Sequence, residues 1–278
     1  MAFLTSRDNA FIKTVIALQT RKGRKKHQQF LAEGPHLLEE ALKSSYEVKA
    51  VLTKGELKRE GRIWEQIEAQ RIPVYTVAPK LFNELTETEN PQALLGVVAQ
   101  PPEPSGFPPV EQDFLGLVLV QIQDPGNLGT ILRTAWAAGF QHIFITPGTV
   151  DPYGGKVVRA SQGGIFNLRI YPASLPELLS WAKEERIKLW AADPCGRLLY
   201  FQADYTGPTL FLFGNEAHGF ALTGSLDQST VKRVRIPLPG GADSLNVAIS
   251  AGILLYEALR QRFPQEIPAG KLSDKGVE

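Results

Sequence analysis

The sequence is poor in residues that bind metals or form disulfides, and it has no long apolar run. Of its 278 residues, one is a cysteine (Cys195) and four are histidines. A single cysteine excludes an internal disulfide and any zinc site built from paired cysteines, and four scattered histidines argue against a metal cluster. No apolar run reaches the roughly 18 residues that span a bilayer, and charges interrupt the N-terminal MAFLTSRDNAFIK where a signal peptide would be apolar. We therefore expect a soluble cytoplasmic protein with no metal and no membrane partner.

The chain also lacks a strong net charge, but its charge is unevenly distributed. A hydrophobic fraction of 43% and a charged fraction of 21% are typical of a globular chain with a real core, which excludes global disorder. The formal net charge is +1, yet the first 30 residues hold seven basic side chains and one acidic one. The run RKGRKK supplies most of them: Arg21, Lys22, Arg24, Lys25 and Lys26. This cluster either meets a polyanion such as RNA or is a solvated loop.

A proline-rich segment divides the chain. Residues 101–112 read PPEPSGFPPVEQ, with five prolines in the first ten positions. Proline fixes φ and donates no backbone hydrogen bond, so this segment is predicted to be an extended linker. We expect one domain over residues 1–100, a second over 113–265, and a flexible polar tail over 266–278.

Both domains have the alternating pattern of α/β proteins. In the first, helix-like segments (36–44 and 62–71) alternate with strand-like ones (47–53 and 73–77), and 93–100 is a short apolar run.

In the second domain, the continuous apolar run 115–122 predicts a strand covered on both faces. A helix over 129–139 follows, and further strands are predicted over 142–146, 187–193, 209–214 and 231–238. The predicted last helix, 244–263, carries one apolar face: Leu245, Ala248, Ile249, Gly252, Ile253, Tyr256 and Leu259. This alternation favours a parallel sheet, with ligands at the carboxyl ends of its strands.

Three loops at those ends carry polar residues, although no standard nucleotide fingerprint is present. The first is DPGNLG (124–129), in which Asn127 is a good N-cap and Arg133 follows within the helix. The second, FGNEAHG (213–219), places Glu216 directly after an apolar strand, where a carboxylate is costly to bury unless it is paired or used. Each loop also has a purely structural explanation as a turn.

The third loop, IPLPGGADSLN (236–246), is rich in proline and glycine. Its glycines leave backbone groups open to a flat heterocycle, and Asp243 or Ser244 is expected to cap the last helix. Asn246 is a poor helix former, which indicates a specific role.

Taken in order, NxGxxxR (127–133), FGNEAHG (213–219) and IPLPGGADSLNVAISAGILLYEALRQ (236–261) resemble the three motifs of the SpoU/TrmH family of RNA ribose 2′-O-methyltransferases, in the SPOUT superfamily. FLAEGPHLLEEAL (30–42) and TETENPQALLGVV (86–98) are similar to the family's small ribosomal-protein-like substrate-binding domain. The resemblance implies a second domain with a trefoil knot and a parallel sheet. It also implies a homodimer, with S-adenosyl-methionine as methyl donor.

The resemblance assigns site residues position by position. Arg133 matches the catalytic arginine, Asn127 and Glu216 match the polar residues of the first two motifs, and Ser244 and Asn246 match those of the third. Cofactor contacts are expected at six positions: Gly214, Asn215, Ile236, Leu238, Leu245 and Asn246. The basic run would hold RNA phosphates. The stretch 159–164, RASQGG, resembles a further family loop, but Gln162 departs from the usual pattern there.

Ribosomal RNA is the expected substrate because a separate N-terminal RNA-binding domain suits members that act on ribosomal RNA. Transfer RNA is the alternative substrate, and a resistance methyltransferase acting on the ribosome would have the same motifs. A non-catalytic ribosome-assembly factor on this scaffold is a third possibility, although Asn127, Arg133, Glu216, Ser244 and Asn246 are all retained.

Overall fold

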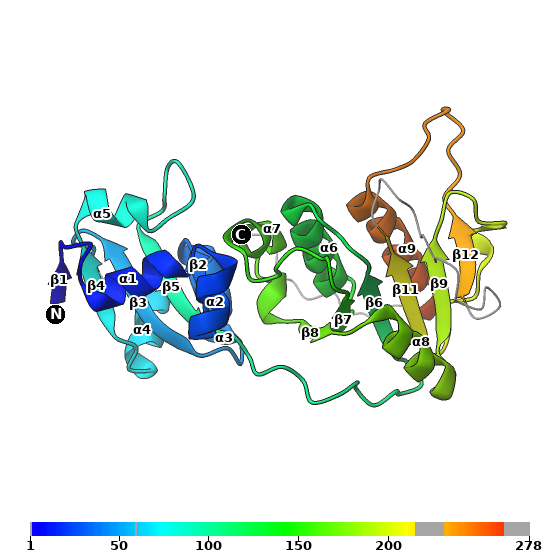
Figure 1. Ribbon diagram of the computed structural model, residues 1–278, viewed down its shortest axis with the longest axis horizontal. Coiled ribbons are helices and arrows are strands. Elements are labelled where there is room, and N and C mark those ends of the chain that lie inside the picture. Colours follow the sequence, from blue (N-terminus) through cyan, green and yellow to red (C-terminus); the bar gives the residue numbers. More distant parts are fainter. Residues whose placement is uncertain (1, 59, 215–230, 264–278) are drawn as a thin grey trace.

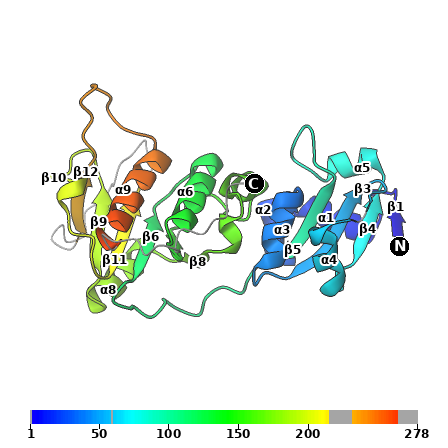
Figure 2. The same ribbon diagram turned by 180° about the vertical axis from the view of Figure 1, so that it is seen from behind.

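The computed structural model describes residues 2–58, 60–214 and 231–263, which form two lobes side by side (Figure 1). Each lobe is built on its own sheet. Residues 100–114 contain no helix or strand, and they run along one edge of the molecule from the first lobe to the second (Figures 1 and 2).

The first lobe contains a mixed five-stranded sheet in the order β1-β4-β3-β5-β2. Its strands are β1 (Ala2–Leu4), β2 (Gln29–Glu33), β3 (Val48–Lys54), β4 (Val74–Val77) and β5 (Leu94–Ala99). Its helices are α1 (Ala10–Ala17), α2 (Arg21–His27), α3 (Pro35–Lys43), α4 (Arg62–Ala69) and α5 (Pro79–Glu84). β3 pairs parallel with β4 and antiparallel with β5. The predicted helices and strands of this region are present, whereas β1, β2, α1, α2 and α5 were not predicted.

The second lobe contains a seven-stranded sheet in the order β10-β12-β9-β11-β6-β7-β8, and all its pairings are parallel. Its strands are β6 (Leu115–Leu119), β7 (His142–Ile145), β8 (Arg169–Pro172), β9 (Lys188–Ala192), β10 (Leu198–Leu199), β11 (Thr209–Phe213) and β12 (Val231–Arg235). Its helices are α6 (Pro125–Ala137), α7 (Gly155–Ser161), α8 (Leu175–Glu184) and α9 (Val247–Arg262), with 3₁₀ turns η1 (Gly164–Phe166) and η2 (Tyr200–Gln202). The predicted parallel sheet is confirmed. The knot stays a prediction, and residues 215–230 lie outside the described part of the chain.

Both faces of this sheet are covered, which explains the continuous apolar runs. In β11, Phe211 and Phe213 belong to the core cluster that includes α6 and α9, while Leu210 and Leu212 belong to the cluster that includes α8. All four side chains are at most 1% exposed. A central parallel strand with helices on both sides cannot alternate apolar and polar residues.

The last helix differs from its prediction. It starts at Val247 instead of 244, and its buried side includes Val247, Ala251 and Leu254. Two members of the predicted apolar face are exposed in the single chain: Ile249 by 54% and Tyr256 by 50%. Within the described residues, no helix has both the length and the hydropathy needed to cross a bilayer.

Helix α7 joins the two lobes through charged contacts. Arg159 of α7 bridges two carboxylates of the first lobe, with Nη1 3.2 Å from Glu33 Oε2 and Nη2 3.0 Å from Glu87 Oε2. Arg24 of α2 reaches the other way and lies 2.8 Å from Asp151 Oδ2. The Arg24 side chain is only 8% exposed and also donates to the carbonyls of Leu18 and Gln19, so it is a structural residue of the interface.

An aromatic cluster lies beside these ion pairs. Phe30 of β2 contacts Tyr46, Tyr153 and Phe166, with ring centroids 5.0–6.1 Å apart. The Tyr46 hydroxyl donates to the carbonyl of Ile165 at 3.0 Å. Burial raises the pKa of both tyrosines, so they stay neutral in the apolar interface.

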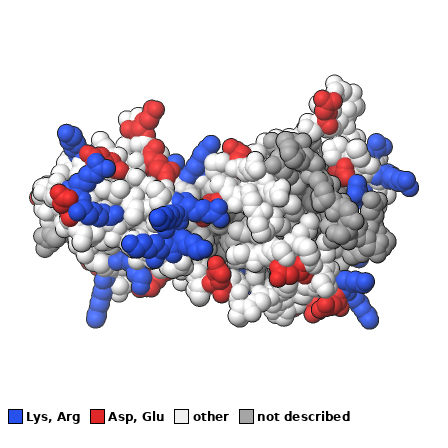
Figure 3. Space-filling view, viewed as in Figure 1, with Lys and Arg blue, Asp and Glu red and all other residues white. Residues whose placement is uncertain are grey.

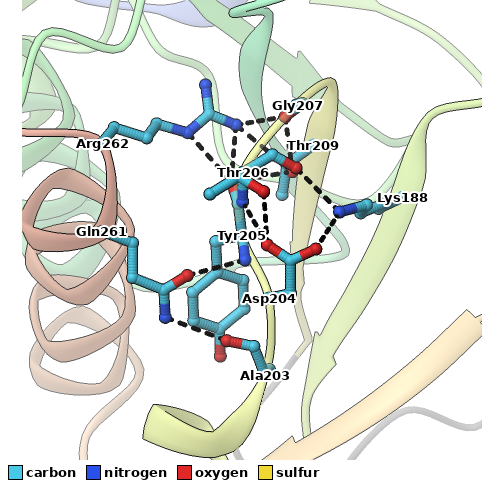
Figure 4. Close-up of polar contacts among 9 residues, drawn as sticks. All are labelled: Lys188, Ala203, Asp204, Tyr205, Thr206, Gly207, Thr209, Gln261 and Arg262. Carbon is cyan, nitrogen blue, oxygen red and sulfur yellow. Dashed lines mark hydrogen bonds and ion pairs between the residues drawn. The ribbon is translucent and has the colours of Figure 1, made fainter.

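Arg262, in the last turn of α9, ties this helix to the loop before β11 (Figure 4). Its Nε donates to the carbonyl of Tyr205 at 2.9 Å, and Nη2 donates to the carbonyls of Tyr205 and Gly207. Nη1 donates to the carbonyl of Asp113 at 2.7 Å. One guanidinium thus satisfies backbone acceptors at the end of the linker and in the loop, because its planar fork carries five N–H donors.

Replacing Arg262 by alanine should lower the free energy of unfolding by about 2 kcal/mol, because several half-buried carbonyls lose a charged donor. Urea unfolding measures the effect. Arg197→Ala is the control, because the Arg197 side chain is exposed, and its change should stay within about 0.5 kcal/mol. Equal unfolding midpoints for the two variants would contradict the assigned role of Arg262.

Candidate active site

The first motif forms the start of α6, but Asn127 is not its cap. The N-cap is Asp124, whose Oδ1 accepts a hydrogen bond from the Asn127 amide at 2.7 Å, and Pro125 is the first residue of the helix. The expectation that Asn127 caps this helix is therefore wrong. A proline in the first turn lets the helix begin at residue 125, three residues earlier than a cap at Asn127 would allow, since its missing donor costs nothing there. The Asn127 side chain lies in the first turn and takes part in a different contact.

That contact is with Asn246, at the start of α9. Asn246 Nδ2 donates to Asn127 Oδ1 at 2.9 Å. Asn246 is itself the N-cap of α9, and its Oδ1 accepts from the amides of Ala248 and Ile249 at 2.9 and 3.3 Å. The expectation that Asp243 or Ser244 caps this helix is therefore wrong. The capping position explains why a poor helix former stands here. Nδ2 of the same side-chain amide joins the third motif to the first.

Arg133 lies on the exposed side of α6. Among the described residues, it has no ion pair or hydrogen bond through its side chain. A solvated guanidinium of this kind is available to bind an anion such as a phosphate.

Two glycines let α7 and η1 approach the backbone of α6 beside Arg133. A Cβ at Gly164 would lie 2.9 Å from the Leu132 carbonyl oxygen, and one at Gly129 would lie 2.4 Å from the Ala160 Cβ. Both distances are too short for any side chain. These glycines escaped the sequence analysis, although the Gly163-Gly164 doublet in RASQGG was a visible signal of close packing.

The loop after β12 brings apolar side chains and open backbone groups together. β12 ends at Arg235, earlier than predicted, and Ile236, Leu238 and Leu245 are half-buried in the loop that follows. Among the described residues of this loop, one internal backbone hydrogen bond is present, from the Gly241 amide to the Leu238 carbonyl. Such a loop suits a flat heterocycle, with apolar contacts to its faces and backbone hydrogen bonds to its edge.

The other expected site residues are placed less completely. Gly214 is half-buried directly after β11, and Ser244 is exposed in the loop before α9. Asn215 and Glu216 lie outside the described residues. The structure therefore brings the first and third motifs together, while the described part of the second is limited to Phe213 and Gly214. Within the described residues, no group of three or more His, Cys, Asp or Glu side chains is placed to hold a metal ion.

The basic run forms a helix, not a loop. α2 begins after the N-cap Thr20, and Gly23 packs so closely on α1 that a Cβ would lie 1.9 Å from the Ala17 carbonyl oxygen. This contact turns one side of α2 inward, together with Arg24. The remaining four cations are exposed: Arg21, Lys22, Lys25 and Lys26. Figure 3 shows them as a dense basic patch over α2, near the junction of the lobes.

A groove of about 790 Å³ runs beside this patch, between the two lobes and the linker. Arg21 and Lys25 line it from the first lobe, and Arg169 lines it from the second. The expected phosphate contact of Arg24 does not fit this arrangement, because its guanidinium is already paired with Asp151.

Comparisons with known proteins match both lobes of the chain. A model of the SpoU rRNA Methylase family matches residues 115–256, and a model of the MRM3-like substrate binding domain matches residues 9–96. The 23S rRNA (guanosine(2553)-2′-O)-methyltransferase RlmP of Bacillus subtilis is 35% identical over 256 residues, covering 92% of this chain and 98% of the relative. The 23S rRNA (uridine(2479)-2′-O)-methyltransferase of Streptomyces viridochromogenes is 33% identical over 267 residues, covering 94% of this chain and 92% of the relative.

Solved structures give the same result. The AdoMet-bound rRNA methyltransferase from Sinorhizobium meliloti superimposes with a TM-score of 0.83 at 31% identity, over 94% of this chain and 98% of that one. The family model and the relatives both cover the lobe in which Asn127 and Asn246 meet. The chain therefore belongs to the SpoU rRNA methylase family.

Proposed function

We propose that this protein transfers a methyl group from S-adenosyl-methionine to a ribose 2′-hydroxyl of ribosomal RNA, as a cytoplasmic homodimer. The observation that carries the proposal is the hydrogen bond between Asn127 and Asn246, because it places the helix bearing Arg133 beside the loop suited to a heterocycle. Membership of the family supplies the chemistry, and the relatives that act on 23S rRNA support ribosomal RNA as the substrate.

The loop of residues 236–246 fits the cofactor. Ile236, Leu238 and Leu245 would hold the adenine between apolar side chains, and the open backbone groups of the loop would bind its edge. Gly214 and Asn215, directly after β11, would complete the site. When bound, the cofactor supplies a methyl group activated by the positive charge on sulfur.

Arg133 would prepare the other reactant. A ribose hydroxyl is a weak nucleophile, so it must be aligned for in-line attack and must lose a proton. A guanidinium presents paired N–H donors that match phosphate oxygens, and we therefore assign Arg133 to the phosphate beside the reacting ribose. Held in this way, the phosphate fixes the hydroxyl and can accept its proton. The Asn127–Asn246 pair would keep the start of α6 in place.

Arg133→Ala should lower methyl transfer by about 100-fold or more while leaving cofactor affinity unchanged, because alignment is lost and the cofactor loop is not altered. Labelled S-adenosyl-methionine is incubated with unmodified large-subunit ribosomal RNA and, separately, with bulk transfer RNA, and each RNA is digested to nucleosides. Labelled 2′-O-methylnucleoside from the ribosomal RNA alone is the expected result. Arg62→Ala, which removes an exposed arginine on α4, is the control and should retain full activity.

Other outcomes of this experiment would overturn specific parts of the proposal. Label in the transfer RNA alone would change the substrate class. Cofactor binding without transfer to either RNA would favour a non-catalytic assembly factor. Full activity of Arg133→Ala would remove Arg133 from the mechanism.

The basic patch on α2 would hold RNA phosphates. Changing Arg21, Lys22, Lys25 and Lys26 to glutamine should reduce the slope of log K against log salt by about 3, since up to four phosphate contacts are lost. Filter binding to ribosomal RNA at several salt concentrations measures this slope. Arg24 is left unchanged, because its removal would leave Asp151 unpaired at the interface. Lys58→Gln with Lys183→Gln, both exposed elsewhere, should preserve the slope, and an unchanged slope in the fourfold variant would refute the assignment.

The homodimer would form through α6 and α9. Their outer surfaces expose three large side chains: Ile249 by 54%, Tyr256 by 50% and Trp136 by 37%. Gly252, between the first two on α9, lies against α6, where a Cβ would be 3.8 Å from Thr134 Cγ2. Large apolar side chains gathered on two packed helices are typical of an interface between chains. This explains why the sequence pattern of α9 is apolar on more sides than the single chain buries.

Ile249→Asp combined with Tyr256→Asp should convert a dimer into a monomer, because two charges would be buried without partners at its centre. Analytical ultracentrifugation distinguishes the two masses. Phe3→Asp is the control: Phe3 is 58% exposed in the first lobe, and its substitution should leave the dimer intact. A wild-type protein that sediments at the mass of one chain would refute the dimer.

A further inference from the structure

A second pocket opens between the lobes beside Arg159. It encloses about 390 Å³, within the roughly 300–1,000 Å³ of small-molecule sites. The first lobe contributes residues near the start of α3 and in the segment before β5, and α7 contributes its C-terminal end. The residues used below are Gly34, His36, Asn90, Gln92, Arg159 and Gln162.

The Arg159 guanidinium that lines this pocket is already paired with two carboxylates. Arg159 bridges Glu33 and Glu87, the Thr88 hydroxyl donates to Glu33, and the Glu87 amide donates to Glu33 Oε2 at 3.3 Å. A phosphate would have to displace two carboxylates from the guanidinium to bind there. The pocket is therefore suited to a neutral polar ligand.

The groups that line the pocket have the hydrogen-bonding character of a base reader. Asn90 and Gln92 present exposed amides, each with donors and an acceptor. Gly34, at φ +97°, leaves room for Gln92, since a Cβ there would lie 2.4 Å from Gln92 Oε1. His36 adds an exposed ring, held with Nε2 3.3 Å from the Gln162 carbonyl oxygen. Amides and an aromatic ring are what proteins use to read unpaired RNA bases.

The pocket is also close in space to Arg133, through the short segment from Gln162 to Gly164. Gln162 lines it, and two residues later Gly164 lies against the Leu132 carbonyl of α6, where a Cβ would be 2.9 Å away. Two residues span no more than about 7 Å. A base in the pocket would therefore belong to a nucleotide near the ribose that Arg133 positions.

We propose that this interlobe pocket receives an unpaired base of the substrate RNA, one or two nucleotides from the methylated ribose, and reads it through Asn90 and Gln92. The proposal rests on the proposed function and deepens it. It assigns the choice of nucleotide to the junction of the two lobes, while the basic patch on α2 supplies affinity without reading sequence.

The test combines chemical footprinting with removal of the base. Wild-type protein bound to unmodified large-subunit ribosomal RNA should protect the Watson–Crick edge of one unpaired base near the mapped methylation site from dimethyl sulfate or a carbodiimide. In Asn90→Ala with Gln92→Ala, that protection should be lost and the RNA KM should rise about 10-fold with kcat unchanged. Asn83→Ala removes an exposed amide of the same lobe away from the pocket, and it should behave as wild type.

An RNA lacking the protected base isolates the contact. Wild-type protein should bind this abasic RNA about 10-fold more weakly than intact RNA, and the double variant should bind both RNAs equally. Equal binding of the two RNAs by wild type, or a footprint that persists in the double variant, would overturn the proposal. If wild type binds the RNA but transfers no methyl group, the proposed function fails, while the footprint and the abasic RNA still decide what the pocket holds.

Discussion

The arrangement of the whole molecule depends on the backbone contact between α6 and the α7–η1 segment. Gly129 and Gly164 remove the two side chains that would hold these segments apart, and interiors packed at crystal density do not accommodate even one extra carbon at such distances. α6 carries Asn127 and Arg133, whereas α7 carries Arg159, which binds the first lobe. A displacement of α7 would thus move the first lobe, which we propose holds RNA, relative to Arg133, the arginine proposed to position the ribose.

α6 and α9 are held in place relative to each other as a result. Its inner face is fixed by the sheet and by α7, and its first turn is joined to α9 through Asn246. α9 is in turn fixed at its other end by Arg262 (Figure 4). A helix secured at both ends keeps a cap residue in one position, and a preorganised site needs that.

The sequence predicted the architecture well where burial alone decides it. Runs such as 115–122 and 209–214 are apolar throughout because both faces of the sheet are covered, and this pattern is unambiguous. Prediction from the sequence failed where the role of a side chain depends on the partner that it contacts in the fold. The apolar residues of α9 do not reveal which of them face the sheet and which face outward, so Ile249 and Tyr256 were placed on the same apolar face as the buried Ala248. Asp124 and Asn127 are equally good caps by residue type, and the geometry of Pro125 decided between them. Arg24 differs from its basic neighbours only through Gly23, whose contact with α1 turns that side of α2 inward.

The strand order has a consequence for how the chain is made. The first lobe is complete once β5 has been synthesised, so it can fold while the rest is still emerging from the ribosome. β6 cannot complete its pairing then, because its neighbour β11 lies about 90 residues further along, or about 5–20 s later at ordinary rates of translation. During that interval the edge of β6 that later pairs with β11 has unpaired backbone N–H and C=O groups. The growing chain therefore carries a finished first lobe ahead of a sheet that still lacks its central strand.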